Sequence, residues 1–426
     1  MRALFFALLI LAGVWWVYRT HSVSTGLSPS VDSAVREEIG NDPVVEGMEA
    51  RLYLNGLRER AGLVPFYRNE ALEKAAAGHA SYLASNRADG HYQNPSLPGF
   101  TGESPADRAV AAGYPSRVVR ENLSSGNLDS KESVDGLFSA IYHRFGFLDP
   151  EMDEIGIAYA RDRSGRRIYV YDMGSYRIAE LCRQEGYRGR GEYLLGLCAD
   201  GAMRVGRAKF TKVSQMNAKR SGKVIVWPYE GQKDVPPAFF EEIPDPLPGY
   251  SVSGYPISIV FNDFFFKRVS IGSFRLYDAG DKREIPVRLM GSHNDPHHLL
   301  EENQYAIFPL ERLEYATRYI ARVDYVADGR SGAKEWHFTT RRFDAPILRV
   351  TGSEAQFRIE PQKSYILYLQ PHGPNDLPKE LLHPRGVVVE QIDPNTFRIE
   401  ISGGTDTPVT IVAGGRKIRL EVASAR

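Results

Sequence analysis

The sequence predicts an α+β protein in which a helix-rich block with a small sheet is followed by two β-sandwich-like domains. Apolar residues recur at helical spacing in the first third of the chain, and the period then changes to two in "IGIAYA" and "RRIYVYDM". Beyond residue 250, apolar and polar residues alternate in almost every segment, with Gly and Pro turns at regular intervals. The chain has 426 residues, which is more than one compact core usually supports. We therefore expect several domains, of which only the first contains many helices.

The helix-rich block carries capping residues where helices should begin. Asn69 precedes one helical segment, and Ser104 with Pro105 opens another. The apolar face of the segment after Asn69 consists of Leu72, Ala76, His79 and Leu83. A histidine on such a face is more often a core residue than a ligand. Residues 44–178 are therefore predicted to form one mixed domain.

The remainder of the chain divides into three parts. Residues 179–249 are irregular and are predicted to be a connecting segment, which contains the strand candidate "GKVIVWPY". Residues 250–342 and 343–426 are predicted to be two β-domains. The pattern of strand and turn residues in "RYIARVDYVADGRSGAKEWHFTT" resembles that of bacterial Ig-like modules, which serve as spacers or binding surfaces. Residues 343–426 show the alternation of apolar and polar residues that indicates strands, and they resemble no particular family.

The chain opens with an apolar run, "MRALFFALLILAGVWWVYRTHS". Its aromatic end suits a membrane interface, and a clear small-residue cleavage site is missing close behind it. We predict that residues 1–20 are a signal anchor, with a cleaved signal peptide as the alternative, and that residues 21–43 are a linker. Either alternative places the rest of the chain outside the cytoplasm, in the periplasm or on the cell surface. The first alternative also makes the membrane a partner.

Charge and cysteine content narrow the function further. Lys plus Arg equals Asp plus Glu, so no basic excess exists to neutralise phosphates, and nucleic acid is not an expected partner. The two cysteines, Cys182 and Cys198, fit no zinc or redox motif. In an exported chain they are expected to form one disulfide, and two separate buried thiols are the alternative.

Four segments of the helix-rich block have a recognisable order and spacing. They are "LNGLRERAGLVPFYRNEALEKAAAGHASYLA", "GHYQN", "SPADRAVAAGYPSRVVRENLSSG" and "YHRFGFLDPEMDEIGIAYA". Together they resemble the CAP superfamily, which comprises cysteine-rich secretory, antigen 5 and pathogenesis-related 1 proteins, and in particular its bacterial SCP-like branch. The resemblance covers about residues 48 to 175. It implies a three-layer α-β-α sandwich with a central antiparallel sheet.

The resemblance also implies a cleft that gathers two histidines and one or two acids. Carried over, the histidines are His91 and His143, and the acid is Glu121. Neutral imidazoles and a carboxylate suit zinc or another divalent cation, and they suit acid–base chemistry equally well. The implied metal ligands are His91 and His143, and the three residues together are the candidate catalytic group.

This sequence departs from the family pattern in two places. Arg120 stands where the family motif has a glycine, and a guanidinium that pointed inward would lower the pKa of Glu121. The family's second acid, three residues after a tryptophan, is absent from the matching stretch 137–140. Tyr92 and Asn122 neighbour the site residues and are expected to line the cleft.

Three functions remain open from the sequence. The first is a cell-envelope protein that binds a lipid, glycan or protein ligand in the His/Glu cleft, with the β-domains as spacers or partner-binding modules. The second is a hydrolase in which His91, Glu121 and His143 activate water to cleave peptide, lipid or glycan. The third is a surface scaffold without catalytic activity.

Overall fold

The structure is a computed structural model that describes residues 42–401 and 408–423. The predicted signal anchor lies outside these residues, as does nearly all of the predicted linker. Among the described helices, none has the length and apolar character that crossing a membrane requires. Residues 43–426 form one compact unit.

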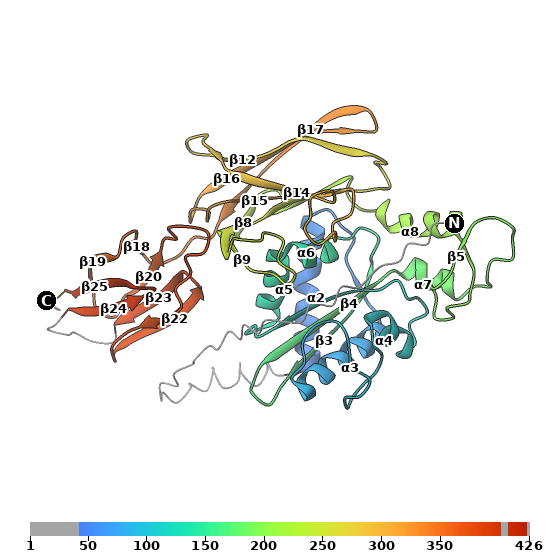
Figure 1. Cartoon of the computed structure of the whole chain (residues 1–426), viewed down its shortest axis with the longest axis horizontal. Helices are drawn as coiled ribbons and strands as arrows, with labels where there is room; N and C mark the ends of the chain where they lie inside the picture. Colours follow the sequence, from blue (N-terminus) through green and yellow to red (C-terminus); the bar gives the residue numbers. More distant parts are fainter. Residues whose placement is uncertain (1–41, 402–407, 424–426) are drawn as a thin grey trace. The chain divides into compact units, whose positions relative to one another are not determined.

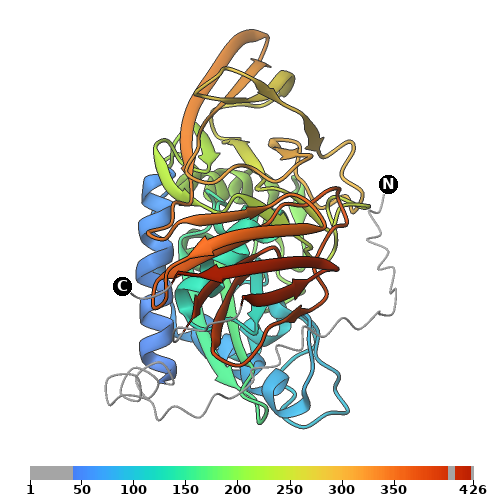
Figure 2. The ribbon, with the colours of Figure 1, turned by 90° about the vertical axis from the view of Figure 1, so that its left-hand side faces the viewer.

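The first part of this unit has three layers (Figure 1). The central sheet contains β1 (Tyr67–Arg68), β2 (Arg120–Ser125), β3 (Glu154–Arg161) and β4 (Arg167–Gly174) in the order β1-β3-β4-β2. One face packs against α2 (Pro43–Arg60), α5 (Ser130–Ser139) and α6 (Ile141–Phe147), and the other against α3 (Glu70–Asn86) and α4 (Pro105–Ala111). Figure 2 shows α2, in blue, along one side of this block. The predicted α-β-α sandwich is confirmed, and its sheet is antiparallel except for the short β1–β3 pair.

Strict alternation along β3 and β4 makes the two layers possible. Ile155 and Tyr171 belong to the core formed with α2 and α5, whereas Ala158 and Val170 pack against α3. Gly156 faces α3 as well, and a Cβ at this position would lie 2.0 Å from the backbone of α3. The sheet and α3 therefore touch backbone to backbone at this glycine.

The first β-domain consists of two sheets, with the orders β14-β15-β11-β7 and β13-β12-β16-β17-β8. Its strands are β7 (Val224–Trp227), β8 (Gln232–Val235), β11 (Ile257–Phe261), β12 (Val269–Asp278), β13 (Glu284–Ile285), β14 (Val287–Gly291), β15 (Gln304–Pro309), β16 (Arg318–Ala327) and β17 (Arg330–Thr340). A separate short pair joins β9 (Ala238–Phe240) and β10 (Val252–Gly254). Thus β7 and β8 come from the segment expected to be a connection, residues 179–249, and each joins one of the two sheets.

The second β-domain also has two sheets, with the orders β18-β20-β23-β22 and β19-β25-β24-β21. Its strands are β18 (Ile347–Val350), β19 (Glu354–Ile359), β20 (Ser364–Leu369), β21 (Leu381–Leu382), β22 (Val387–Asp393), β23 (Thr396–Ile401), β24 (Val409–Ala413) and β25 (Arg416–Val422). This domain has a hydrophobic core of its own. The prediction of two β-domains after the mixed domain is confirmed.

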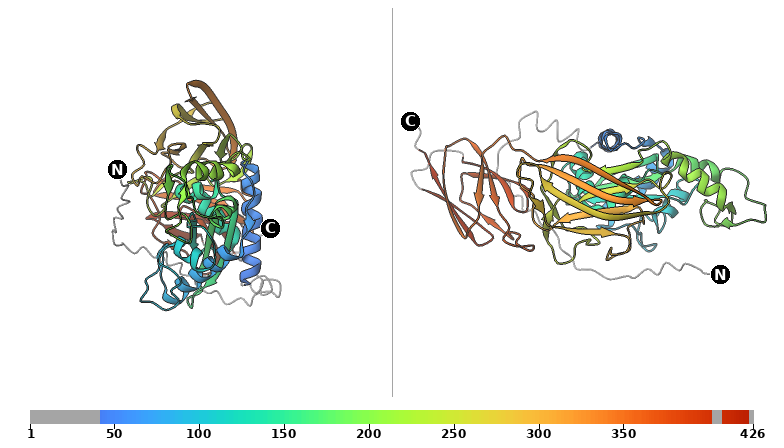
Figure 3. Two further views of the ribbon diagram at one scale, coloured as in Figure 1. Left: turned by 90° about the vertical axis from the view of Figure 1, so that its right-hand side faces the viewer. Right: turned by 90° about the horizontal axis from the view of Figure 1, so that it is seen from above.

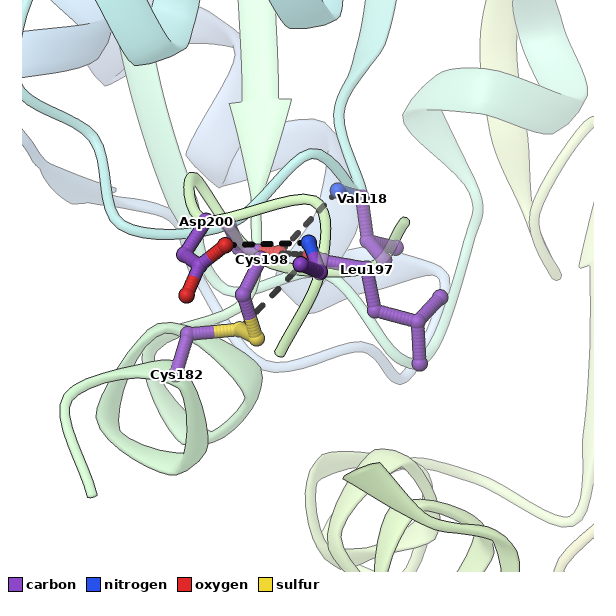
Figure 4. The surroundings of a disulfide bond; sticks show 7 residues. Val118, Cys182, Leu197, Cys198 and Asp200 are labelled. Atoms are coloured by element: carbon purple, nitrogen blue, oxygen red, sulfur yellow. Dashed lines mark hydrogen bonds between the residues drawn. A yellow bond between two sulfur atoms is a disulfide. The ribbon is translucent and has the colours of Figure 1, made fainter. Parts of the chain in front are cut away.

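A disulfide organises the segment between the sandwich and the β-domains. Cys182 and Cys198 are bonded, as expected, with an S–S distance of 2.03 Å (Figure 4). The bridge lies among α7 (Tyr176–Cys182), β5 (Tyr193–Leu194), β6 (Val205–Gly206) and α8 (Arg207–Ala218). Closing a loop of this size stabilises the fold by roughly 3 kcal/mol in the chain-entropy model. Figure 3 shows the segment, in light green, extending to one side of the sandwich.

The sandwich and the first β-domain share one continuous hydrophobic core. The rings of Phe138 on α5 and Trp227 on β7 are stacked with centroids 4.1 Å apart. The buried guanidinium of Arg144 on α6 donates to the carbonyl oxygen of Pro256, just before β11, at 2.7 Å. The β-domain is therefore packed against the α5–α6 layer.

We expect Gly156→Ala to lower the free energy of unfolding by about 3 kcal/mol or more, because α3 and β3 would have to separate. Gly136 on α5 is a matched control, since its Cβ would meet nothing closer than 4.0 Å. There alanine should add about 0.5–1 kcal/mol of stability through helix propensity. Urea unfolding of the two variants measures both effects. Equal stability of the two would contradict the close backbone contact.

Candidate functional site

The first half of the site is a histidine held by a buried carboxylate. His91 lies in the loop between α3 and α4, and Glu121 is the second residue of β2. The Nδ1 atom of His91 is 2.9 Å from the Oε1 atom of Glu121. The His91 side chain is 39% exposed, whereas that of Glu121 is 1% exposed. The imidazole is thus accessible to solvent while the carboxylate that orients it is not.

Arg108 on α4 supplies the charge that Glu121 needs in this buried position. Its Nη2 atom donates to the Oε2 atom of Glu121 at 2.5 Å, and its Nη1 atom donates to the carbonyl oxygen of His91 at 2.9 Å. Burial alone would raise the pKa of Glu121. The hydrogen bond with His91 and the charge of Arg108 outweigh burial and lower that pKa to about 2. Glu121 is therefore ionised, and both of its oxygens are occupied by partners.

A second carboxyl lies next to Glu121. Asp172 on β4 is directly opposite Glu121 in the antiparallel pairing and is fully buried. Neither of its side-chain oxygens accepts a hydrogen bond from an N–H or O–H group of a described residue. Burial, and then the negative charge of Glu121, raise the pKa of Asp172 well above its usual range. The pair therefore carries one charge, on Glu121.

The second half of the site repeats the arrangement with other residues. His143 lies in α6, and its Nδ1 atom is 2.7 Å from the Oε1 atom of Glu242. Glu242 also accepts hydrogen bonds from the backbone N–H groups of Ile141 at 2.6 Å and Tyr142 at 3.1 Å. The helix has no side-chain cap of its own, since Ala140 occupies the N-cap position. Glu242 thus caps α6 and orients its histidine with one buried carboxylate.

The two halves lie beside each other. The ring centroids of His91 and His143 are 6.3 Å apart. Each imidazole uses Nδ1 for its carboxylate, and no described residue forms a hydrogen bond with either Nε2 atom. The structure therefore brings together His91, Glu121 and His143, as the sequence predicted.

Glu242 was not found from the sequence. It lies in the predicted connecting segment, 99 residues from His143. The family's second acid is missing from residues 137–140, and Glu242 provides a carboxylate on the second histidine instead. The acidic run "FEEIPDP" was the only local sign of it, and nothing in that run distinguishes Glu242 from the exposed Glu241.

Arg120 does not act on Glu121. It forms ion pairs with Asp149 and with Glu301 of the first β-domain, both at 2.6 Å. Successive residues of a strand point to opposite faces, so the side chain of Arg120 leaves the face on which Glu121 lies. Arg120 therefore does not meet the condition of pointing inward, and Arg108 is the guanidinium that lowers the pKa of Glu121.

Two further predicted residues occupy different surroundings. Tyr92 is 55% exposed, next to His91. Asn122 is 4% exposed and donates from Nδ2 to the carbonyl oxygen of His143 at 2.8 Å. Asn122 therefore joins β2 to α6 and has little surface on which to meet a ligand.

His79 forms the base of the His91 loop. It is fully buried, its Nε2 atom lies 3.1 Å from the carbonyl oxygen of Gly90, and its Nδ1 atom lies 3.1 Å from the side-chain nitrogen of Gln93. Burial lowers its pKa to about 4. His79 is thus a neutral core histidine, as expected from its place on the apolar face of α3.

The site offers few donor atoms for a metal ion. Across residues 42–401 and 408–423, no group of three or more His, Cys, Asp or Glu side chains is arranged to hold a metal. Since Glu121 and Glu242 are occupied by other partners, the two Nε2 atoms are the donors that this site offers.

Comparison with known proteins defines the class of this domain. Residues 52–173 match the model of the cysteine-rich secretory protein family, CAP. The three-layer block is therefore a CAP domain, and the region that follows it is all-β except for α7 and α8. No curated protein matches the sequence.

Two solved structures with similarity to this chain come from bacteria. An outer surface protein from Borrelia burgdorferi is 25% identical, with 30% of this chain and 92% of that chain covered and a TM-score of 0.27. An extracellular protein containing a SCP domain, from Bacillus anthracis str. Ames, is 16% identical, with 35% of this chain and 44% of that chain covered and a TM-score of 0.28.

The buried His79 should make stability depend on pH. In the folded chain it stays neutral down to about pH 4, whereas in the unfolded chain it binds a proton below about pH 6.5. The unfolded state therefore gains protons first, and stability falls as the pH drops from about 6.5 to 4, by on the order of 3 kcal/mol. Urea unfolding at pH 7 and pH 4.5 measures the change.

The variant His79→Gln should remove that part of the pH dependence. His337→Gln is the matched control, because His337 lies at the surface on β17, with its side chain 37% exposed. An unchanged pH dependence in His79→Gln would mean that His79 titrates alike in the folded and unfolded chain.

Proposed function

We propose that this chain is an exported cell-envelope protein that binds a ligand between His91 and His143, with a divalent cation held by the two imidazoles. One observation carries the proposal. Two histidines, with side chains 39% and 17% exposed and ring centroids 6.3 Å apart, are each held through Nδ1 by a carboxylate that is 1% exposed.

The arrangement of the carboxylates supports a cation. An imidazole that donates its Nδ1–H to a carboxylate keeps an electron pair on Nε2, and metal-binding histidines commonly have this partner. Two protein ligands leave coordination positions open for an external ligand. A bound zinc ion would supply a Lewis acid for an anionic or carbonyl oxygen of that ligand.

The rest of the chain supports an exported location. The N-terminal apolar run has the composition of a signal anchor or signal peptide, and a disulfide persists best outside the cytoplasm. In this proposal the first β-domain contributes to the site through the segment that holds Glu242. The second β-domain, with its own core, is a module for an envelope partner.

The variant Glu242→Gln tests the second half of the site. We expect it to weaken zinc binding by roughly 10- to 100-fold, because His143 loses the carboxylate that orients it. Isothermal titration of the full chain with zinc in a non-ionic detergent measures the affinity. The matched control is Glu241→Gln, which changes the exposed neighbouring residue and should leave the affinity unchanged.

The double variant His91→Ala/His143→Ala completes the test and should abolish binding at this site. Equal zinc uptake by this variant and the original chain would contradict the proposed cation site. A loss in Glu242→Gln together with a full loss in the double variant would support it.

A second candidate is a hydrolase. A histidine held through Nδ1 by a buried carboxylate also has the geometry of a general base, which takes a proton from water at Nε2. Assays on casein, short-chain esters and cell-wall fragments would detect this activity. We expect any turnover that depends on this site to be lost in His91→Ala/His143→Ala. Turnover that survives in that variant would exclude these residues from the chemistry.

A further inference from the structure

The neutral chain contains one strongly basic segment. Residues 183–223 include ten Lys or Arg residues and three acidic residues, whereas the whole chain has 53 of each. The remaining residues therefore carry the compensating acidic excess. This segment spans the disulfide-closed loop and α8, outside the CAP domain and apart from the His91–His143 site.

Helix α8 divides into two faces. Its inner face packs through Phe210 and Val213 on the small core that contains the disulfide, and Ser214 and Asn217 on this side are buried. Its outer face presents Arg207, Ala208, Thr211, Lys212, Gln215 and Met216, and the C-cap residue Lys219 continues this face. The inner face therefore fixes the helix, and the outer face is free of the core.

The outer face forms one wall of a cavity of about 1130 Å³. The loop residues Tyr187, Gly191 and Glu192 form a second wall, and Phe264, which follows β11, lies on the remaining side. This volume exceeds the usual size of a pocket for a small ligand, which is ~300–1,000 Å³. The cavity is thus large enough for an extended molecule.

The basic side chains around the cavity are only partly neutralised. Glu192 is the single acid in the lining, and it pairs with Arg207 at 3.0 Å. Lys212 forms no ion pair with any described residue, and Lys219 lies 5.9 Å from the ring centroid of Phe264. The rim therefore keeps a positive charge that suits an anionic group.

The interior of the same cavity is apolar. Met216 is 40% exposed into solvent, and Ala208, Phe264 and the methylene stems of the lysines complete an apolar surface. A nucleic acid or another polyanion would leave this apolar surface uncovered, since its backbone is bound by charge. A molecule with both an anionic group and a long apolar part covers both surfaces.

We infer that the cavity formed by α8, the loop 187–192 and Phe264 is a binding site for an anionic phospholipid. The phosphate lies at the basic rim near Lys212 and Lys219, and an acyl chain lies along Met216 and Phe264. Basic residues gain affinity at the anionic surface of a membrane, and burial of an acyl segment adds an apolar contribution. This site shares no residue with the histidine pair, so the lipid proposal and the cation proposal can be contradicted independently.

The test uses residues 43–426, which form a compact unit, so that the apolar run at the start of the chain does not itself enter the vesicles. Binding is measured by co-sedimentation with phosphatidylcholine vesicles that contain either none or about one-third phosphatidylglycerol. We expect binding only to the anionic vesicles, with an affinity that falls as the salt concentration rises. Water-soluble short-chain phosphatidylglycerol, below its micelle concentration, should bind as a monomer.

Three variants separate the two parts of the cavity. Lys212→Ala/Lys219→Ala should weaken vesicle binding by roughly tenfold or more, and Met216→Gln should weaken it severalfold without a change of charge. Lys233→Ala/Lys417→Ala removes two exposed lysines of the β-domains and is the matched control, which should bind within about twofold of the original. Thermal unfolding establishes that each variant is folded.

Two outcomes would overturn the inference. One is equal binding to both kinds of vesicle. The other is binding that is lost in the lysine variant but is unchanged in Met216→Gln and absent for monomeric lipid. That second pattern, together with equal binding of dextran sulfate, would define a surface for polyanions instead of a lipid site.

Discussion

The hydrogen bonds of the Glu242 carboxylate link the candidate site to the segment that precedes the first β-domain's strand β10. This carboxylate is buried at 1% exposure, and a buried charge is stable only when hydrogen bonds satisfy it. Here the first N–H groups of α6 and the imidazole of His143 provide those bonds. The segment after β9 therefore supplies both the cap at the start of α6 and the partner that orients His143. A residue from outside the CAP domain thus contributes to the site.

In the other half of the site, the buried carboxylate of Glu121 is stabilised by a balance of charges. Glu121 lies in a buried position between Arg108 and Asp172, and only one of the two acids is ionised. The guanidinium compensates that single charge, and the neutral Asp172 adds none. The Glu121 carboxylate thus orients His91 through Nδ1, while the other ring nitrogen stays accessible. Two unrelated sets of residues therefore produce the same histidine–carboxylate arrangement.

A continuous core holds these two halves at a fixed separation. Phe138 and Trp227 stack across the boundary between the CAP domain and the β-sheets, and Arg144 crosses it to the chain before β11. A hinge at this boundary would expose a buried arginine and a large aromatic contact, both at a high cost in free energy. The first β-domain is consequently fixed to the CAP domain by this shared core. The second β-domain has a separate core and is joined to the first by polar and aromatic contacts, among them the buried Arg312, which pairs with Asp393 at 2.7 Å, and Tyr315, whose ring lies 5.5 Å from that of Tyr368.

The sequence by itself determined the features that local physics controls. Asn69 and the Ser104–Asp107 capping box start α3 and α4, alternation sets the two faces of β3 and β4, and the cysteine pair closes its loop. The family motifs added His91, Glu121 and His143. Only the tertiary structure decided which charges meet: Arg108 and Asp172 reach Glu121, Arg120 does not, and Glu242 reaches His143 from 99 residues away. Such contacts depend on the direction of each side chain and on the path of a distant segment, and neither is encoded in the spacing of residues along the chain.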